Sequence, residues 1–226
     1  MTYKTTNIFC IIASTGSEQE LYLNHILSDN QFIKSTKLSR LIYNTTKPKD
    51  KYTPSFEKYN YVTLDQYKEI PSSLIIDFRS YYTIPYDTVY YFTLTKDIED
   101  KDNLICITCP YQYENYKRWI SLENLKNPEH DKYRIYAIFI NSKLKDRINN
   151  RLSKSEMNED INLLEFCRRV LQDHAEFKDA QVRIPELNDP LDCDNVCYIN
   201  SKSTNSDFKK NIEQIKEFIL DKVKKH

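Results

Sequence analysis

The first strongly patterned segment of the chain is an almost uninterrupted apolar run, Asn7-Ile-Phe-Cys-Ile-Ile-Ala13. Such a run is typical of a strand that is buried on both faces of a parallel sheet. A turn over 14–17 follows, and Ser17 with Glu20 has the spacing of a capping box, which predicts that a helix begins there. Apolar positions between 21 and 27 give this helix one apolar face. The apolar run, the turn and the capped apolar face together predict a strand, a tight turn and a helix in succession.

Residues 33–100 follow a different pattern, in which short stretches alternate polar and apolar positions. Such alternation predicts strands of a small mixed sheet, at 41–46, 59–63, 73–78 and 88–93. A short helix over 64–70 interrupts them and ends at Pro71, because the residue before a proline disfavours helical backbone. We therefore expect an inserted lobe at 33–100.

Buried-strand character returns after residue 100. The pattern predicts strands at 103–108, 133–140 and 196–200, and helices at about 112–125, 143–152, 160–176 and 207–225. The segment 178–195 contains two prolines and four aspartates and predicts a loop. Strands that alternate with helices predict an α/β fold of three layers, in which helices cover both faces of a parallel sheet.

Composition limits the possible classes of protein. With 226 residues, the chain is long enough for one α/β domain that carries an inserted lobe. Lysine plus arginine and aspartate plus glutamate each number 33, so no overall charge favours nucleic acid or a membrane surface as a partner. The apolar runs are too short to span a membrane, and no secretory signal is predicted. We expect a cytoplasmic protein with reduced cysteines.

Two features of the composition are unusual. The chain has 18 tyrosines and a single glycine, Gly16. Together with abundant isoleucine, asparagine and lysine, this composition favours an AT-rich genome, such as that of a low-GC bacterium or its phage. Turns that need positive φ must mostly be built without the residue best suited to them.

Six segments, in the same order along the chain, resemble motifs of guanylate kinases, a family of P-loop nucleoside monophosphate kinases. The family's phosphate-binding loop, G-x-x-G-x-G-K-[ST], falls on 13–20, which reads Ala13-Ser-Thr-Gly16-Ser-Glu18-Gln19-Glu20. The other five are similar to the segments 45–67, 76–83, 139–151, 174–177 and 198–200. The resemblance implies one domain over 1–226, with its core at 1–32 and 101–226, a GMP-binding-like lobe at 33–100, and a helical lid at about 143–177.

The phosphate-binding loop has lost the residues that phosphoryl transfer requires. A working loop uses glycines to wrap the phosphates, a lysine to neutralise them and a serine or threonine to hold Mg²⁺. Here the last three positions are Glu18, Gln19 and Glu20. Two carboxylates at a phosphate site repel the ligand, and the acidic residues that the family carries on the third strand fall on 106–108 and are also missing. We predict a catalytically inactive protein; Mg²⁺ and ATP would be cofactors only if it is active.

The side of the fold that would bind the phosphate acceptor keeps more of the family's chemistry. The resemblance implies that Lys47, Lys49, Tyr59 and Tyr82 contact a phosphate, and that Asp77 reads the edge of a guanine. Considered without the resemblance, two lysines and phenolic hydroxyls can form an anion pocket. The alternative is that the lysines are solvated turn residues and that the tyrosines pack within the sheet.

The lid carries two arginines one helical turn apart. The resemblance implies that Arg147 and Arg151 face the phosphates. The alternative is that they pair on the helix surface with Asp146 or Glu156.

Two further constellations are weaker. Four cysteines could form a zinc site, namely Cys106, Cys109, Cys193 and Cys197, but the gap of more than eighty residues between the pairs favours buried thiols and no metal. His25 and His174 have no serine or cysteine near them in an arrangement that would mark a nucleophile.

Three functions follow from these observations. The first is an inactive guanylate-kinase-like module that binds GMP or dGMP, a phosphorylated group or a protein partner. The second is a divergent active kinase that takes a cation from elsewhere, such as Lys117, Lys143 or the lid arginines. The third is an interaction protein with no small ligand, for instance a phage factor that acts in a host cytoplasm. No nucleic acid or membrane partner is expected.

Overall fold

The computed structural model describes residues 4–49, 59–83, 87–126, 128–153, 160–183, 194–201 and 205–224. The chain divides into two compact units, Met1–Arg40 with Asp102–His226, and Leu41–Lys101. None of the described helices is long and apolar enough to cross a membrane.

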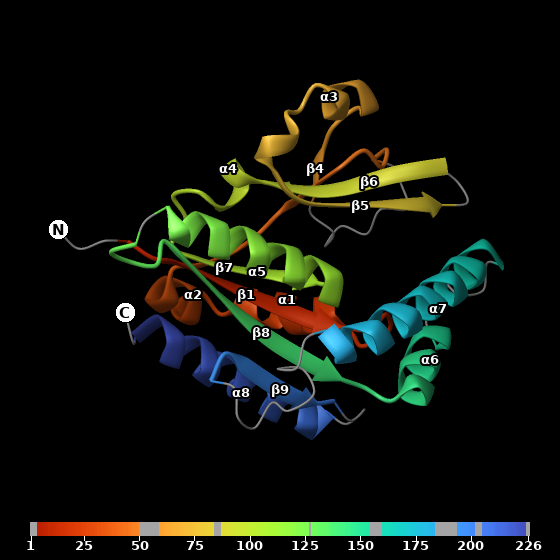
Figure 1. The fold of residues 1–226 in the computed structure, drawn as a ribbon. Coiled ribbons are helices and arrows are strands. Elements are labelled where there is room, and N and C mark those ends of the chain that lie inside the picture. The colour runs from red at the N-terminus through yellow and green to blue at the C-terminus, as the bar shows by residue number, and fades with distance from the viewer. Residues whose placement is uncertain are drawn as a thin grey trace. The chain divides into compact units, whose positions relative to one another are not determined.

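The first unit is built on a five-stranded sheet in which every pair of neighbours is parallel (Figure 1). The strand order is β2-β7-β1-β8-β9. The strands are β1 (Thr6–Ala13), β2 (Leu38–Arg40), β7 (Asn103–Thr108), β8 (Tyr133–Asn141) and β9 (Val196–Asn200). All eight residues of the central strand β1 are buried, which confirms the prediction from its apolar run.

Helices cover both faces of this sheet, with α5 on one side and α1, α2 and α8 on the other (Figure 1). The helices of the unit are α1 (Gln19–Ser28), α2 (Asn30–Thr36), α5 (Pro110–Leu125), α6 (Leu144–Leu152), α7 (Asp160–Arg183) and α8 (Asn205–Lys224). The three-layer α/β prediction is thereby confirmed.

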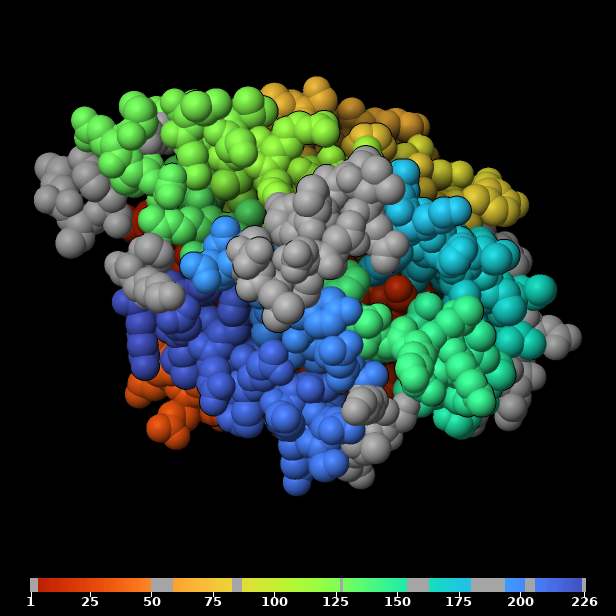
Figure 2. Space-filling model, turned by 60° about the horizontal axis from the view of Figure 1, so that its bottom comes forward, coloured from red at the N-terminus to blue at the C-terminus, as the bar shows by residue number. Residues whose placement is uncertain are grey.

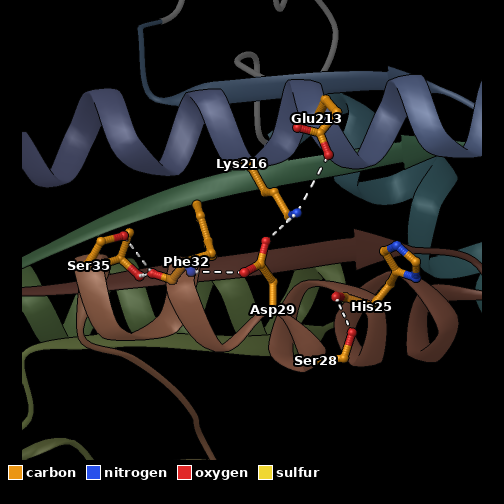
Figure 3. Close-up of polar contacts among 8 residues, drawn as sticks. His25, Ser28, Asp29, Phe32, Ser35, Glu213 and Lys216 are labelled. Atoms are coloured by element: carbon orange, nitrogen blue, oxygen red, sulfur yellow. Dashed lines mark hydrogen bonds and ion pairs between the residues drawn. The ribbon is translucent and has the colours of Figure 1, made fainter.

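One ion pair joins α8 to the start of α2 (Figure 3). Lys216 Nζ lies 2.8 Å from Asp29 Oδ2, and the other oxygen of Asp29 accepts a hydrogen bond from the Phe32 N–H at 3.0 Å. Asp29 therefore caps α2 and anchors α8 at the same time. The hydrogen bond from Lys216 lowers the pKa of Asp29 below its ordinary value.

Three expectations about this unit need correction. Residues 33–40 lie in α2 and β2, so the segment before Leu41 contributes a strand to the parallel sheet rather than to an inserted lobe. Ser17 caps no helix, because α1 begins at Gln19 after Glu18, whose side chain makes no capping bond. Helix α7 continues to Arg183, so the loop expected from 178 is helical as far as that residue.

The second unit contains a four-stranded mixed sheet, as the alternating pattern predicts. Its order is β4-β3-β6-β5, in which β3 and β4 are parallel and the other pairs antiparallel. The elements are β3 (Tyr43–Thr45), β4 (Tyr59–Tyr61), α3 (Leu64–Lys68), the 3₁₀ turn η1 (Ser72–Leu74), β5 (Ile75–Thr83), β6 (Asp87–Leu94) and α4 (Thr95–Ile98). Helix α3 covers one face of the sheet, where Tyr67 stacks on Tyr90 with ring centroids 4.7 Å apart.

Candidate functional site

The turn after β1 has positive φ at two residues, of which only one is glycine. Gly16 has φ +87°, and Glu18 has φ 57°, in the left-handed region. Glu18 occupies a position where the guanylate kinase motif has glycine. A side chain with a Cβ in this conformation costs about 1–2 kcal/mol. Glu18 therefore holds a left-handed backbone that glycine would adopt without strain.

Both backbone hydrogen-bonding groups of Thr15, at the centre of this turn, are taken by side chains from α6 and α7. The Thr15 N–H donates to the carboxylate of Asp173, and Arg147 Nη1 donates to the Thr15 carbonyl at 2.9 Å. In Figure 2, red atoms from the start of the chain are visible between α6 and α7. The Thr15 N–H, which could donate a hydrogen bond to a phosphate oxygen, thus already donates one to a carboxylate of the chain itself.

Gly16 lies directly against α6. A Cβ added to Gly16 would lie 3.0 Å from the carbonyl oxygen of Arg147 and 3.1 Å from its Cβ. No larger residue fits between the turn and the helix without a backbone shift. The chain's one glycine is therefore at a position that needs both positive φ and close approach.

Helix α7 supplies a second carboxylate one turn after Asp173. Glu176 Oε1 accepts a hydrogen bond from the Tyr111 N–H at 3.1 Å, in the first turn of α5. An N–H at a helix N-terminus is a favourable place for an anion. Asp173 thus accepts from the turn after β1, and Glu176 accepts from the first turn of the helix that follows β7.

The contacts at the turn shift two pKa values. Burial raises the pKa of Asp173 above its ordinary value, although the hydrogen bond from Thr15 and the charge of Arg147 act in the opposite direction. Burial also lowers the pKa of Arg147, and the charge of Asp173 opposes that shift. Within the described residues, Arg147 Nε, Ser17 Oγ and Ser142 Oγ are buried and have no hydrogen-bond partner. Such atoms are usually satisfied by water or by a ligand.

Glu20 does not play the repulsive part that its position in the motif suggests. Its two oxygens lie 2.9 Å and 3.2 Å from the terminal nitrogens of Arg40 on β2. This bidentate pair neutralises the carboxylate. Glu18 and Gln19 are half-buried, and Ala13 is buried at the end of β1. A carboxylate that the motif does not include, that of Asp173, accepts a hydrogen bond from the turn's backbone.

Further arginines lie on α6 and α7. Arg168 and Arg169 both pair with Glu165 within α7, at 2.7 Å and 2.9 Å. Arg151 is half-buried on α6. Arg147, the other arginine that the resemblance assigns to a lid, donates to the Thr15 carbonyl. Glu156, a possible pairing partner, lies outside the described residues.

The five cysteines within the described residues form no disulfide with one another. Cys10 and Cys106 are buried on adjacent strands with their sulfurs 3.9 Å apart, and Cys109 Sγ accepts a bond from the Gln112 N–H at the start of α5. Burial raises the pKa of Cys197 to about 12. No group of three or more potential metal ligands occurs within the described residues, and Cys193 lies outside them.

His25, Ser28 and Asp29 lie close together but do not form a nucleophilic triad (Figure 3). Ser28 Oγ donates to the backbone carbonyl of His25 at 2.8 Å, and not to its imidazole. Asp29 is engaged by Lys216. This cluster is a helix junction.

In the second unit, the register of β5 separates the residues predicted to bind the acceptor. Side chains alternate between faces along a strand, so Asp77 and Tyr81 share one face and Tyr82 points to the other. Asp77 is 2% exposed, whereas Tyr82 is 67% exposed. The expected grouping of Tyr82 with Asp77 therefore does not occur on one face of the sheet.

The face that carries Asp77 is rich in tyrosine. Tyr59 and Tyr81 each contact Tyr91, with ring centroids 5.6 Å and 5.8 Å apart, and Tyr59 also contacts Tyr61 at 6.2 Å. We call these four residues the tyrosine face.

Two cations belong to the tyrosine face. Lys49 Nζ lies 5.9 Å from the ring centre of Tyr61, and the Arg79 guanidinium lies 5.0 Å from that of Tyr81. Lys47 is half-buried, and its backbone N–H donates to Thr45 Oγ1 at 3.0 Å. Arg79 and Tyr81 were not predicted as site residues, although alternate positions counted from Asp77 place both on this face.

Comparison with known proteins supports the fold. The structure of a guanylate kinase from Anaplasma phagocytophilum matches with a TM-score of 0.52 at 14% sequence identity, and the match covers 98% of this chain and 88% of that one. A fungal RNA kinase matches with a TM-score of 0.42 at 13% identity, over 100% of this chain and 97% of that one. No protein-family model and no curated protein matches the sequence. The chain has a kinase-like α/β fold of the P-loop type.

Proposed function

We propose that this protein is a guanylate-kinase-like binding module that does not transfer phosphate from ATP. The observation that carries the proposal is the use of both backbone groups of Thr15 by Asp173 and Arg147. A nucleoside triphosphate would have to displace a carboxylate from that amide. It would do so without the lysine and without the glycine that Glu18 replaces.

The ligand that we propose is a phosphorylated one of the GMP type, bound at the tyrosine face. Lys49 and Arg79 supply positive charge there, and the phenol rings supply flat surfaces against which a base can stack. The resemblance assigns Asp77, which lies on the same face and is 2% exposed, to the edge of a guanine. Lys47 lies on the connection that follows β3, and its charge is suited to a phosphate.

Two measurements test the proposal. ATP turnover should not rise above background on addition of GMP, and GMP should bind saturably in a calorimetric titration. Lys49→Ala and Lys47→Ala should each weaken GMP binding by about tenfold, because each removes a charge-assisted contact to phosphate. Tyr82→Phe is the matched control, since Tyr82 points to the opposite face and should leave binding unchanged.

The outcomes separate the proposal from its rivals. GMP-dependent ATP turnover that is lost in Lys47→Ala would instead establish a divergent active kinase. Absence of saturable GMP binding at millimolar ligand would favour an interaction protein with no small ligand. Restoring the loop with Glu18→Gly, Gln19→Lys and Glu20→Ser should not create turnover, because Asp173 still occupies the Thr15 amide.

A further inference from the structure

Strand β5 forms one edge of the four-stranded sheet. It has nine residues, and within the described residues it pairs with β6 alone. It contains neither lysine nor proline, two residues that commonly protect such edges. A bulge interrupts its ladder only near its start, between Ile75 and Asp77.

The outward backbone groups of β5 can be identified from the neighbouring strand. Tyr90 of β6 turns both of its backbone groups toward β3: its carbonyl accepts from the Thr46 N–H at 3.0 Å, and its N–H donates to Thr46 Oγ1 at 2.9 Å. Ser80 lies opposite Tyr90. The N–H and carbonyl of Ser80 therefore point away from β6, and those of Phe78 and Tyr82 do the same because the direction alternates along a strand.

The side chains of these three residues are exposed as well. Phe78 is 54% and Tyr82 67% exposed, and Ser80 between them is exposed. Two aromatic side chains thus flank a serine along an edge whose outward N–H and carbonyl groups fit another strand.

We infer that β5 pairs with β5 of a second copy of this chain, antiparallel, about a two-fold axis at Ser80. In this register Ser80 faces Ser80, and Phe78 faces Tyr82 of the second copy. Each pair joins residues whose backbone groups point outward, so each exchanges two backbone hydrogen bonds. Aromatic pairs across strands add stability to such a ladder.

The face of β5 that carries Asp77, Arg79 and Tyr81 also suits pairing with a second copy. The same register places Arg79 opposite Tyr81 of the second copy. Arg79 already lies over the Tyr81 ring of its own chain, 5.0 Å from its centre, so cation and ring are compatible neighbours on this face. No charged residue meets its own copy at the axis, because Ser80 is neutral. The two tyrosine faces then lie on the same side of one continuous sheet.

Charge substitution at the axis tests this pairing, with mass measured by light scattering over a dilution series. The wild-type chain should reach twice its 27.1 kDa mass at high concentration. Ser80→Glu and Ser80→Lys should each weaken the dimer by about five- to tenfold, because like charges directly opposite one another repel. An equimolar mixture of the two variants should restore it. Glu129→Lys, on the first unit, is a control substitution that should leave the dimer unchanged.

A second variant removes the backbone bonds. Ser80→Pro deletes the outward N–H without touching the ladder to β6, and should abolish the dimer, whereas Ser80→Ala should retain it. Circular dichroism shows whether each variant is folded. A wild-type chain that stays monomeric at every concentration overturns the inference. A dimer that is indifferent to the charge variants, or that is not restored by mixing them, overturns it as well.

Discussion

The two units of the molecule differ in how the backbone groups of one turn and of one edge strand are used. At the turn after β1, the backbone of Thr15 is bonded to side chains of α6 and α7, and Glu20 is paired with Arg40. On the second sheet, the residues of the tyrosine face are half-exposed and the edge of β5 is open. Within the described residues, the backbone of Thr15 is already bonded, whereas β5 pairs with β6 alone and has one edge that another strand could meet.

The first of these regions shows how the chain itself supplies partners for the backbone of a tight turn. Buried backbone N–H groups need partners. Asp173 and Glu176, one turn apart on α7, accept hydrogen bonds from the Thr15 N–H after β1 and the Tyr111 N–H at the start of α5. The turn after β1 is half-buried and is bonded to α6 and α7 of the first unit.

The largest effect should come from Gly16. Gly16→Ala places a Cβ 3.0 Å from the Arg147 carbonyl in a backbone conformation that alanine disfavours. We expect a loss of about 2–4 kcal/mol in the free energy of unfolding, measured with urea. Ser14→Ala in the same turn should change the free energy of unfolding by less than about 0.5 kcal/mol, because the Ser17 N–H donates to the backbone carbonyl of Ser14, which alanine keeps. Equal effects of the two substitutions would mean that α6 is not packed on the turn.

The contact between Arg147 and Thr15 should have the next largest effect. Arg147→Ala removes a charge-assisted bond and leaves Asp173 half-buried without its nearest cation, so we expect a loss of about 1–3 kcal/mol. Hydrogen exchange of the Thr15 amide should become faster. Arg169→Ala, which removes an exposed pair with Glu165, is the matched control and should cost at most about 0.5 kcal/mol. Unchanged exchange at Thr15 would contradict the proposed packing.

Replacing Glu18 with glycine should raise the free energy of unfolding, whereas the two substitutions above lower it. Glu18→Gly places the residue that tolerates left-handed backbone at φ 57° and should stabilise the protein by about 1 kcal/mol. Glu18→Ala keeps a Cβ and should give no comparable gain, which separates backbone strain from the loss of a charge. If alanine and glycine stabilise equally, repulsion between Glu18 and Asp173 is the better explanation.

The sequence predicts some parts of this comparison well and others not at all. The apolar run of β1 and the alternating strands of the second sheet are local patterns, and both predictions are confirmed. Helix α2 and strand β2 were missed because the helix ends at Lys37 in left-handed conformation, where a glycine would have been a signal. The bond between Thr15 and Asp173 joins residues 158 positions apart, which no local pattern reveals.

The site residues show the same division between local and distant information. Asp77 and Tyr81 could have been placed on one face from the period of a strand, and Tyr82 on the other. The pairing of Glu20 with Arg40 could not have been predicted from the sequence, because it depends on β2 lying at the edge of the parallel sheet. A motif identifies positions along the chain, whereas neutralisation of a charge depends on which strand lies next to it.

The smallest effect should be a pair of opposite pH dependences. Burial raises the pKa of Asp173, so the folded state binds its proton more tightly than the unfolded state does, and this group's contribution to stability falls as pH rises through the raised pKa. Lys216 lowers the pKa of Asp29, whose contribution is complete above its unfolded pKa and is lost as pH falls through the lowered value. Urea unfolding between about pH 3 and about pH 7 measures both. Relative to wild type, Asp173→Asn should gain stability as pH rises, and Asp29→Asn should lose it. If both variants follow the same trend, the carboxylate at the turn is solvated like that at the surface, and the contrast between a filled turn and an open sheet loses its electrostatic support.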